Sequence, residues 1–430
     1  MKINEIKSKI ASGDLDNSLV RLYDKASVST QRERYIAALD SFSSIFSDDR
    51  EVNIYSVSGR SELAGNHTDH NCGKVIAASI NLDIIAVVAQ NGTNTINLKS
   101  EGFRQLSIDY TKYSETNPAH FGTSASLVAG MCRGFLDNGH AVGGFDAYCT
   151  SNVLRGSGLS SSAAFEDMVG NILNHEFNEG KVDNVEIAQL AQYAENVFFG
   201  KPCGLMDQVA CAYGGIVSID FEDTKNPKIE KIDFDLTDAG YNLCIVDTGG
   251  NHADLTDDYA SVPAEMKSVA GFFGKTHLRL CDKAQIIENA REIREQLGDR
   301  ALMRALHFCS ENERVDRMKT ALKSDNLDAY FDGVLESGRS SFCYLQNVYT
   351  TKNITEQGLS LALCLTESFM KNKDGAFRVH GGGFAGTIQA YVKESDVSAY
   401  RALMDSVFGE GACLVLRVRP DGAVRVNINE

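Results

Sequence analysis

The stretch from Leu154 to Ala164 reads LRGSGLSSSAA and lies between a strand-like and a helix-like segment. Apolar and polar side chains alternate over the ten residues before it, 144–153, which predicts a strand. After Ser160 the apolar side chains fall on one helical stripe: Phe165, Met168, Val169, Ile172 and Leu173. Gly156 and Gly158 let the backbone approach an anion, and the N–H groups that open a helix attract one. The stretch therefore predicts a phosphate-binding loop.

A simpler interpretation is a glycine turn with a serine helix cap, which is what a bare GxG indicates. The combination of strand, loop and amphipathic helix favours phosphate binding instead. Two other glycine-rich segments do not qualify. FFGKT at residues 272–276 lacks the first glycine of a Walker loop, because that position holds Val269. Gly381, Gly383 and Gly386 satisfy GxGxxG, but a strand pattern rather than a helix follows them.

Length and composition limit the classes of function. A chain of 430 residues predicts two or three domains. The formal net charge of −16 argues against nucleic-acid and anionic-membrane partners, which require a basic face. The most apolar stretch, 75–89, is interrupted by polar residues and is too short to span a bilayer. Eleven cysteines without a CxxC, and a first segment without an apolar leader core, favour a reducing compartment, so we expect a cytoplasmic protein.

The pattern of elements along the chain predicts an α+β protein in two halves. Helical periodicity dominates the first fifty residues, strands follow from Val52, and residues 266–323 are again helical. The last fifty residues alternate strand and helix. The acidic segment 222–238 is the expected boundary or a hairpin insertion. No repeat or low-complexity tract is visible.

Four stretches resemble motifs of the galactokinase branch of the GHMP small-molecule kinases, in order and at plausible spacing. They cover most of the chain between Gly59 and Thr387. We name them the sugar-binding block (GRSELAGNHTDHNCGKVIAASINLD, Gly59–Asp83), the phosphate loop (Gly156–Ala164), the base segment (AENVFFGKPCGLMDQVA, Ala194–Ala210) and the glycine-rich block (VHGGGFAGT, Val379–Thr387).

The resemblance implies a role for each matching residue. Asp207 would take the proton from the anomeric hydroxyl of a sugar, and Arg60 would lower the pKa of that carboxylate and stabilise charge on the transferring phosphoryl group. The other implied residues are Asn66, His67, Asp69, Gly204 and Tyr259 for the sugar; Gly156, Ser157, Gly158, Leu159, Ser160, Ser161, Ser162 and Ala163 for the ATP phosphates; Gly382 and Gly383 near the triphosphate; and Ser162 and Glu195 for magnesium.

The resemblance also implies an architecture. It predicts the two-domain GHMP kinase fold, with an N-terminal α/β domain like ribosomal protein S5, a C-terminal ferredoxin-like α+β domain and the active site in the cleft between them. We expect a helical extension at residues 1–34, a sugar- and ATP-binding domain at 35–222 and a C-terminal domain at 223–430. The implied ligands are ATP, Mg²⁺ and a small sugar. A monomer is expected, with a homodimer as the alternative.

One position departs from the family in a way that bears on the substrate. The galactokinase signature normally has a glutamate where this chain has Asn66, and that glutamate belongs to recognition of the sugar's C6 hydroxyl. An amide donor at this position would tolerate a C6 carboxylate that a glutamate would repel. Galacturonate is therefore an alternative substrate to galactose.

Other functions remain open at the level of sequence. A catalytically silent sugar- and ATP-binding sensor is one, although the Ser160–Ala164 run that such regulators shorten is intact here. Another GHMP kinase, acting on mevalonate, homoserine or an inositol-like alcohol, is disfavoured by the HTD core at residues 67–69. His67 and His70 could also serve as metal ligands, but no third ligand is recognisable at a suitable spacing.

Overall fold

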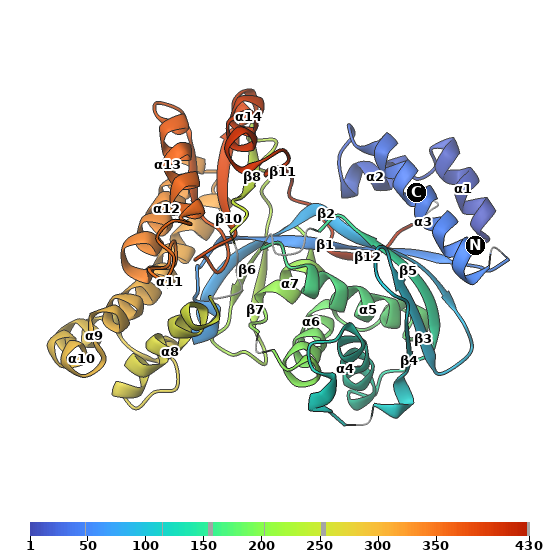
Figure 1. Cartoon of the computed structure of the whole chain (residues 1–430), viewed down its shortest axis with the longest axis horizontal. Coiled ribbons are helices and arrows are strands. Elements are labelled where there is room, and N and C mark those ends of the chain that lie inside the picture. Colours follow the sequence, from blue (N-terminus) through green and yellow to red (C-terminus); the bar gives the residue numbers. More distant parts are fainter. Residues whose placement is uncertain (48, 114, 154–157, 202, 251–254, 428–430) are drawn as a thin grey trace.

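Two sheets carry the fold, one in each half of the molecule (Figure 1). The structure is a computed structural model and describes residues 1–47, 49–113, 115–153, 158–201, 203–250 and 255–427. In these residues the larger sheet has eight strands in the order β12-β1-β2-β5-β3-β4, with β6 pairing to β2 and β7 to β6. The smaller sheet has four antiparallel strands in the order β11-β8-β10-β9.

Two long neighbouring strands, β1 (Asn53–Ala64) and β2 (Lys74–Gln90), run from one half into the other (Figure 1). The apolar run from Ile84 to Ala89 at the end of β2 arises because both faces of the strand are buried there. Ile84, Ala86 and Val88 join one core cluster, whereas Ile85 and Val87 join another. The other strands of this sheet are β3 (Thr95–Ser100), β4 (Leu106–Asp109), β5 (Phe145–Ser151), β6 (Ile216–Asp220), β7 (Lys228–Ile232) and β12 (Ala423–Arg425).

Helices cover both faces of the large sheet. One face packs against α4 (Ser124–Asp137), α5 (Ser161–Phe177), α6 (Asn184–Tyr193) and α7 (Met206–Tyr213), with the π-helical turn η4 (Ala194–Phe199) after α6. The opposite face packs against the N-terminal helices α1 (Ile3–Ser12), α2 (Asp16–Leu22) and α3 (Val28–Phe46). The short turns on this half are η1 (Asp69–Asn71), η2 (Tyr110–Lys112) and η3 (Pro118–His120).

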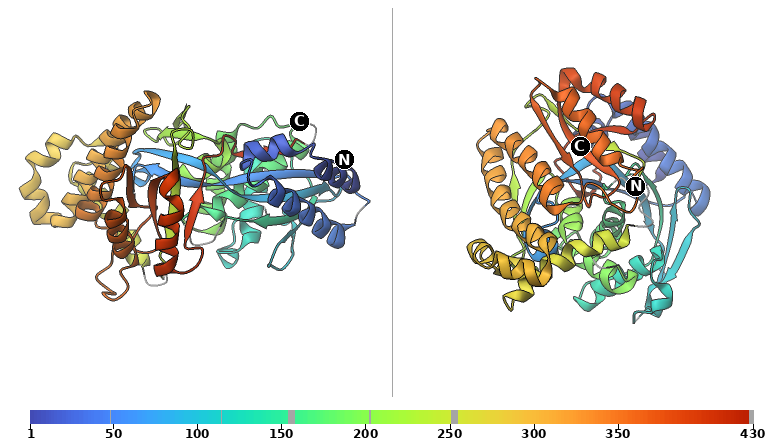
Figure 2. Two further views of the ribbon diagram at one scale, coloured as in Figure 1. Left: turned by 90° about the horizontal axis from the view of Figure 1, so that it is seen from above. Right: turned by 60° about the vertical axis from the view of Figure 1, so that its left-hand side comes forward.

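The C-terminal half joins a small sheet to a set of helices. Its strands are β8 (Tyr241–Asp247), β9 (Gly375–Val379), β10 (Thr387–Lys393) and β11 (Cys413–Leu416). Its helices and turns are α8 (Thr256–Phe272), η5 (Leu278–Leu280), α9 (Lys283–Glu288), α10 (Ala290–Leu297), α11 (Asp299–Lys323), α12 (Leu327–Ser340), η6 (Ser341–Leu345), α13 (Gly358–Met370), η7 (Glu394–Asp396) and α14 (Val397–Phe408). Figure 2 places α8 to α11 and the N-terminal helices at opposite ends of the molecule.

A buried carboxylate ties the N-terminal helices to the sheet. Asp83 on β2 is fully buried and pairs with Arg34 of α3 at 2.6 Å and with Arg419 at 3.2 Å. Tyr23 and Ser56 donate hydrogen bonds to the same carboxylate. Burial raises the pKa of Asp83, but the two guanidinium groups and the hydroxyls outweigh it, and the pKa lies below its ordinary value. The helical extension is thus an integral packing element.

The structure confirms the mixed α+β architecture, and its elements can be compared with the expected boundaries. The boundary after residue 34 falls inside α3, and the boundary after residue 222 falls inside the β6–β7 hairpin. We propose instead that the extension ends with α3 at Phe46 and that the first domain continues through Ile232 and takes back β12 near the C-terminus. Among the described residues, no helix is both long and apolar enough to cross a bilayer.

Replacing Asp83 by asparagine should lower the free energy of unfolding by about 3–5 kcal/mol at neutral pH, because Arg34 and Arg419 would keep buried charges without a counter-ion. The exposed Asp49, which pairs with Lys2 at 3.0 Å, provides the control, and Asp49→Asn should cost less than about 1 kcal/mol. Urea unfolding curves measure both effects.

The difference in unfolding free energy between wild type and Asp83→Asn should depend on pH. Because the pKa of Asp83 is lower in the folded protein, its contribution is present at neutral pH and is lost as the pH falls through the folded value. The difference in unfolding free energy between wild type and Asp83→Asn should therefore become smaller in acid. A difference that is equal at all pH values would contradict a lowered pKa of Asp83 in the folded protein.

Candidate active site

A two-pronged ion pair joins two of the predicted site residues. Nε and Nη2 of Arg60, on β1, donate to the two carboxylate oxygens of Asp207, each at 2.7 Å. The third guanidinium nitrogen, Nη1, donates to the carbonyl oxygen of Gly158 in the phosphate loop. Asp207 lies in the first turn of α7, and its side chain is one-third exposed while Arg60 is buried. Arg60 therefore joins the predicted base and the phosphate loop in one cluster.

The electrostatics of this cluster keep Asp207 ionised. Burial raises the pKa of Asp207, but the Arg60 guanidinium, the Ser160 hydroxyl and the Lys201 ammonium together hold it below the ordinary value. Ser160 donates its hydroxyl to the same carboxylate. Asp207 is therefore an ionised carboxylate that is open to the cleft on one side.

The phosphate loop meets β1 and opens α5 as predicted. The backbone N–H of Arg60 donates to the Leu159 carbonyl at 3.1 Å, and a β-carbon on Gly59 would lie 2.9 Å from that same oxygen. Residue 59 must therefore be glycine for the loop to approach so closely. Ser160 precedes the helix with a positive φ of 61° and uses its side chain on Asp207 instead of capping. Gly156 and Ser157 lie outside the described residues.

A cavity of about 940 Å³ opens beside the start of α5. Ser161 and Ser162 of the phosphate loop line one end of it, and Ala163 behind them is buried. The remaining lining residues come from β2, β3, β4, β5, α4, α5 and η4 and from the segments between these elements, and they include Leu98, Phe103, Arg104, Leu106, Ser124, Leu127 and Phe165. An elongated ligand could thus extend from the helix N-terminus into this cavity.

The predicted magnesium ligand Glu195 lies in the π-helical turn η4 and is buried. One carboxylate oxygen accepts from the Lys201 ammonium at 3.0 Å, and the other accepts from the Gln208 amide at 3.1 Å. The same Gln208 nitrogen reaches Glu166 at 3.4 Å. Burial and then the charge of Glu195 raise the pKa of Glu166 well above its usual range.

Two of the predicted sugar residues, Asp69 and Gly204, contact each other. His67 and Tyr259 contact the glycine-rich block. Asp69, at the start of η1, packs against Gly204 of the base segment. Nε2–H of His67 donates to the carbonyl of Gly382 at 2.8 Å. Burial and the neighbouring His70 lower the pKa of His67 to about 4, so the ring is neutral at neutral pH. Its Nδ1 atom has no partner among the described residues.

The predicted sugar residue Tyr259 approaches the same block from α8. Its hydroxyl donates to the carbonyl of Gly383 at 2.7 Å, and its ring packs against Gly382 and Phe384. Gly383 has a φ of 78°, and a β-carbon there would lie 1.9 Å from the Asn347 carbonyl, so only glycine fits. Sugar-side and phosphate-side residues therefore converge on this block.

Asn66, which the resemblance implies as a sugar contact, lies between the sugar-binding block and the glycine-rich block. Its side chain is fully buried, and all of its hydrogen-bonding capacity is used. Nδ2 donates to the Gly381 carbonyl at 2.7 Å and to Glu62 at 3.3 Å. Oδ1 accepts from Asn347 at 2.9 Å and from Ser341 at 3.1 Å. Asn66 clamps the sugar-binding block to the glycine-rich block, and it offers no donor to a ligand.

The phosphate loop and the glycine-rich block also meet through histidine. Nε2 of His380 lies 3.1 Å from the Ser61 hydroxyl, and Nδ1 lies 2.9 Å from the Thr387 hydroxyl. Gly158 packs close to both His380 and Thr387. Burial and then the charge of Arg60 lower the pKa of His380 well below its ordinary value, so the ring is neutral. Sequence reasoning did not single out His380, Lys201 or Asn347.

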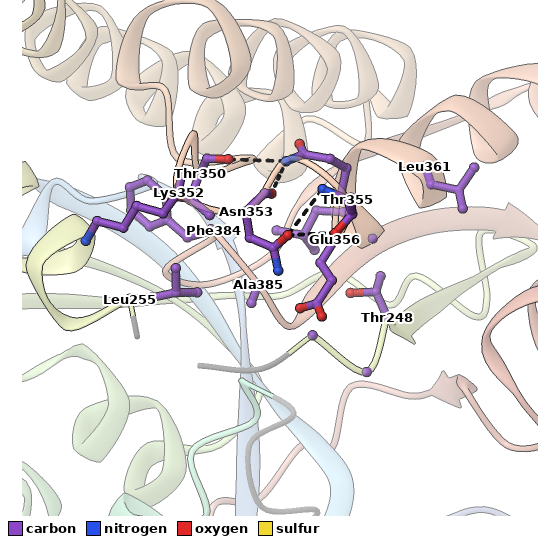
Figure 3. Close-up of a pocket in the computed structure, with 15 residues that line it drawn as sticks. Thr248, Leu255, Thr350, Lys352, Asn353, Thr355, Glu356, Leu361, Phe384 and Ala385 are labelled. Atoms are coloured by element: carbon purple, nitrogen blue, oxygen red, sulfur yellow. Dashed lines mark hydrogen bonds between the residues drawn. The ribbon is translucent and has the colours of Figure 1, made fainter. Parts of the chain in front are cut away.

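A second cavity, of about 660 Å³, lies in the C-terminal half (Figure 3). It is bounded by the loop from Thr350 to Gly358, by Gly249 and Gly250, and by Phe384 and Ala385. The Gln357 amide donates to the carbonyls of Thr350 and Asn353, which holds this loop in place. Of the predicted site residues, none is among the described residues that line this cavity.

Two family models and several known proteins match this chain. Residues 126–215 match the GHMP kinases N terminal domain, and residues 40–90 match the galactokinase galactose-binding signature. A galactokinase of Glaesserella parasuis is 30% identical over 352 residues, which is 80% of this chain and 86% of that protein. A galactokinase of Clostridium tetani is 29% identical over 371 residues, which is 84% of this chain and 88% of that protein.

Solved structures agree in fold. The Lactococcus lactis galactokinase complexed with galactose superposes with a TM-score of 0.76 and 24% identity, covering 91% of this chain and all of that one. A mevalonate kinase superposes with a TM-score of 0.59 and 17% identity, covering 85% of this chain and 98% of that one. The predicted GHMP kinase architecture is thereby confirmed.

Replacing Asn66 by aspartate should destabilise the protein by about 2–4 kcal/mol, because both amide donors would become acceptors facing Glu62 and the Gly381 carbonyl. The same substitution at the exposed Asn372 should change the free energy of unfolding by less than about 0.5 kcal/mol. Chemical denaturation of the two variants provides the comparison. Equal stability of Asn66→Asp and wild type would show that the clamp contributes nothing.

Proposed function

The chain belongs to the galactokinase family of GHMP kinases, and on this premise we propose that it transfers the γ-phosphoryl group of ATP to the anomeric hydroxyl of galactose. The products would be galactose 1-phosphate and ADP. The arginine–carboxylate pair formed by Arg60 and Asp207 at the edge of the phosphate loop is the observation that supports this reaction best. It sets a proton acceptor beside an anion-binding loop, as phosphoryl transfer to an alcohol requires.

In the proposed mechanism Asp207 accepts the proton of the sugar hydroxyl. A carboxylate with a lowered pKa is a weak base, so the proton would transfer only as the hydroxyl oxygen becomes acidic during bond formation to phosphorus. Arg60 would keep Asp207 ionised and place positive charge next to the phosphoryl group. The backbone N–H groups at the start of α5 would bind the phosphates, because the helix dipole favours negative charge there.

The cavity beside α5 suits the rest of ATP. It is continuous with Ser161 and Ser162, and apolar side chains such as Leu98 and Phe165 line its depth. An adenine base buries well against such side chains, and a few polar groups at the rim can orient it. We therefore place the nucleoside end of ATP in this cavity.

The residues present suit magnesium bound together with ATP. Glu195 supplies a buried charged carboxylate and Ser162 a hydroxyl at the helix start, which are the oxygen ligands that Mg²⁺ prefers. In the described part of the chain, no three histidine, cysteine or carboxylate side chains gather to hold a metal by themselves. That sparse set fits a cation that keeps waters and phosphate oxygens as its other ligands, and its charge would neutralise the transferring phosphoryl group.

Galactose is the substrate we favour. His67 and Tyr259 contact the glycine-rich block, Asp69 packs against Gly204 of the base segment, and the Lactococcus neighbour was solved with galactose. The physical reason for considering galacturonate was a free amide donor at residue 66, and Asn66 has none. The sensor alternative has no support, because Ser160, Arg60 and Asp207 form one connected cluster.

The test of this proposal is ADP release with ATP and Mg²⁺ across galactose, galacturonate, N-acetylgalactosamine, arabinose and glucose. Galactose should give the highest kcat/KM. Preference for galacturonate would refute the assignment of substrate, and absence of turnover on all five sugars would favour the sensor.

Replacing Asp207 by asparagine should lower kcat by about 10²–10⁴-fold, because the proton acceptor is lost while the shape remains. Galactose binding, measured by calorimetry, should stay within a few-fold of wild type. Gln192→Glu, outside the cluster, makes a change of similar size and serves as the control for folding and assay. Retained turnover in Asp207→Asn would exclude the general-base role.

Replacing Ser124 by tryptophan should fill the mouth of the α5 cavity and raise the KM for ATP about tenfold or more, with little change in the KM for the sugar. Ser124 is exposed at the start of α4, so the fold should tolerate the larger side chain. Ser44→Trp on α3, which does not line the cavity, provides the control. Parallel changes in both KM values would contradict this placement of the nucleotide.

A further inference from the structure

Lys201 is a cation of the active site that none of the assigned roles explains. Its ammonium lies 3.0 Å from Glu195, and its backbone N–H also donates to the Glu195 carbonyl at 3.1 Å. The Lys201 side chain is 62% exposed, whereas the Glu195 side chain is 4% exposed. Its charge also interacts with that of Asp207. Lys201 thus lies on the open side of a buried carboxylate, near the proposed base.

An ordinary surface ion pair does not combine one exposed and one buried side chain. Pairs such as Lys181–Glu179, with side chains 75% and 77% exposed, join two solvated groups and contribute little. Glu195 is shielded from water, and besides the ammonium its carboxylate has two neutral described hydrogen-bond donors, the Gln208 amide and the Cys203 thiol. A buried carboxylate needs a counter-ion, and before a metal arrives the Lys201 ammonium supplies it.

The same position makes Lys201 a competitor of magnesium. Glu195 has one oxygen on Gln208 and the other on Lys201, so a cation that binds this carboxylate competes with the ammonium for it. The displaced group is a flexible, three-donor cation at the edge of a site that receives a triphosphate. Phosphate oxygens are the strongest partners that such a site would offer it.

We propose that Lys201 is a second phosphate-binding cation of the phosphoryl-transfer site, held by Glu195 until the triphosphate binds. In the empty enzyme it neutralises Glu195. When the triphosphate binds, Lys201 releases that carboxylate and binds the phosphate oxygens, where it adds to the charge of Arg60. Mg²⁺ held by Glu195 would supply the positive charge that replaces the ammonium there. This inference rests on the proposed placement of ATP and magnesium, and it does not depend on which sugar is the substrate.

The test measures ATP binding without metal, in EDTA and without sugar, by titration calorimetry. Lys201→Met should weaken metal-free ATP binding about five- to twentyfold, the range of one charge-assisted hydrogen bond in a half-open site. Lys201→Arg should stay within about twofold of wild type, because it keeps the charge. Lys181→Met, which removes an exposed lysine of the same half, should leave binding unchanged.

A double-mutant cycle separates phosphate binding from a merely structural role. Glu195→Gln should tighten metal-free ATP binding, because Lys201 would no longer be held, and the gain should vanish in the double variant Glu195→Gln, Lys201→Met. Thermal melting with Mn²⁺ alone adds an independent readout, since Lys201→Met should gain more stability from the metal than wild type does.

Each result decides the proposal. Metal-free ATP affinity equal in wild type and Lys201→Met, or a gain in Glu195→Gln that persists in the double variant, would overturn it. A wild type that binds no ATP would overturn the nucleotide placement on which it rests. Wild-type binding with galactose turnover absent would refute only the choice of sugar, and the role of Lys201 would stand.

Discussion

The pair between Arg60 and Asp207 imposes the constraint on which the site depends. A buried guanidinium requires its hydrogen bonds to be met, and here the carboxylate of α7 and the Gly158 carbonyl of the phosphate loop meet them. Strand β1, the loop and helix α7 are therefore held in fixed positions relative to one another. Gly59 permits the close approach, and Ser160 adopts an unusual backbone conformation to place its hydroxyl on Asp207. The geometry that a proton acceptor and a phosphate site need is built before any ligand binds.

The second half of the molecule completes the cleft through buried polar contacts. Asn66 and His380 each link the N-terminal half to the glycine-rich block, one on the sugar side and one on the phosphate side. The ion pair of Arg378 with Glu62 at 2.7 Å lies beneath them and is also buried. Such networks are costly when incomplete, which favours a single arrangement of the two halves. The precision of the site thus comes from hydrogen bonds between the halves as well as from the loop itself.

Sequence reasoning located the elements of the site better than it assigned individual contacts. The phosphate loop, Arg60 and Asp207 were predictable, because contiguous motifs carry them and local backbone physics fixes the loop. The contacts of Asn66 could not be predicted, because its partners Ser341 and Asn347 lie some 280 residues away in the chain. Lys201 lay within a recognised motif, but its meaning depends on the burial of Glu195, which no local pattern reveals. The boundary predicted after residue 222 falls inside the β6–β7 hairpin, and a hairpin was the alternative that the sequence offered for this segment.

Phosphorus NMR of the reaction of the purified protein with ATP, Mg²⁺ and galactose tests the central claim most directly, because it reports both the transfer and the position of the new bond. A sugar whose anomeric hydroxyl lies at Asp207 should give a phosphomonoester signal coupled to the anomeric proton, with ADP formed in equal amount. A phosphate on any other carbon, or inorganic phosphate as the sole product, would contradict the placement of the anomeric hydroxyl beside Asp207 and Arg60.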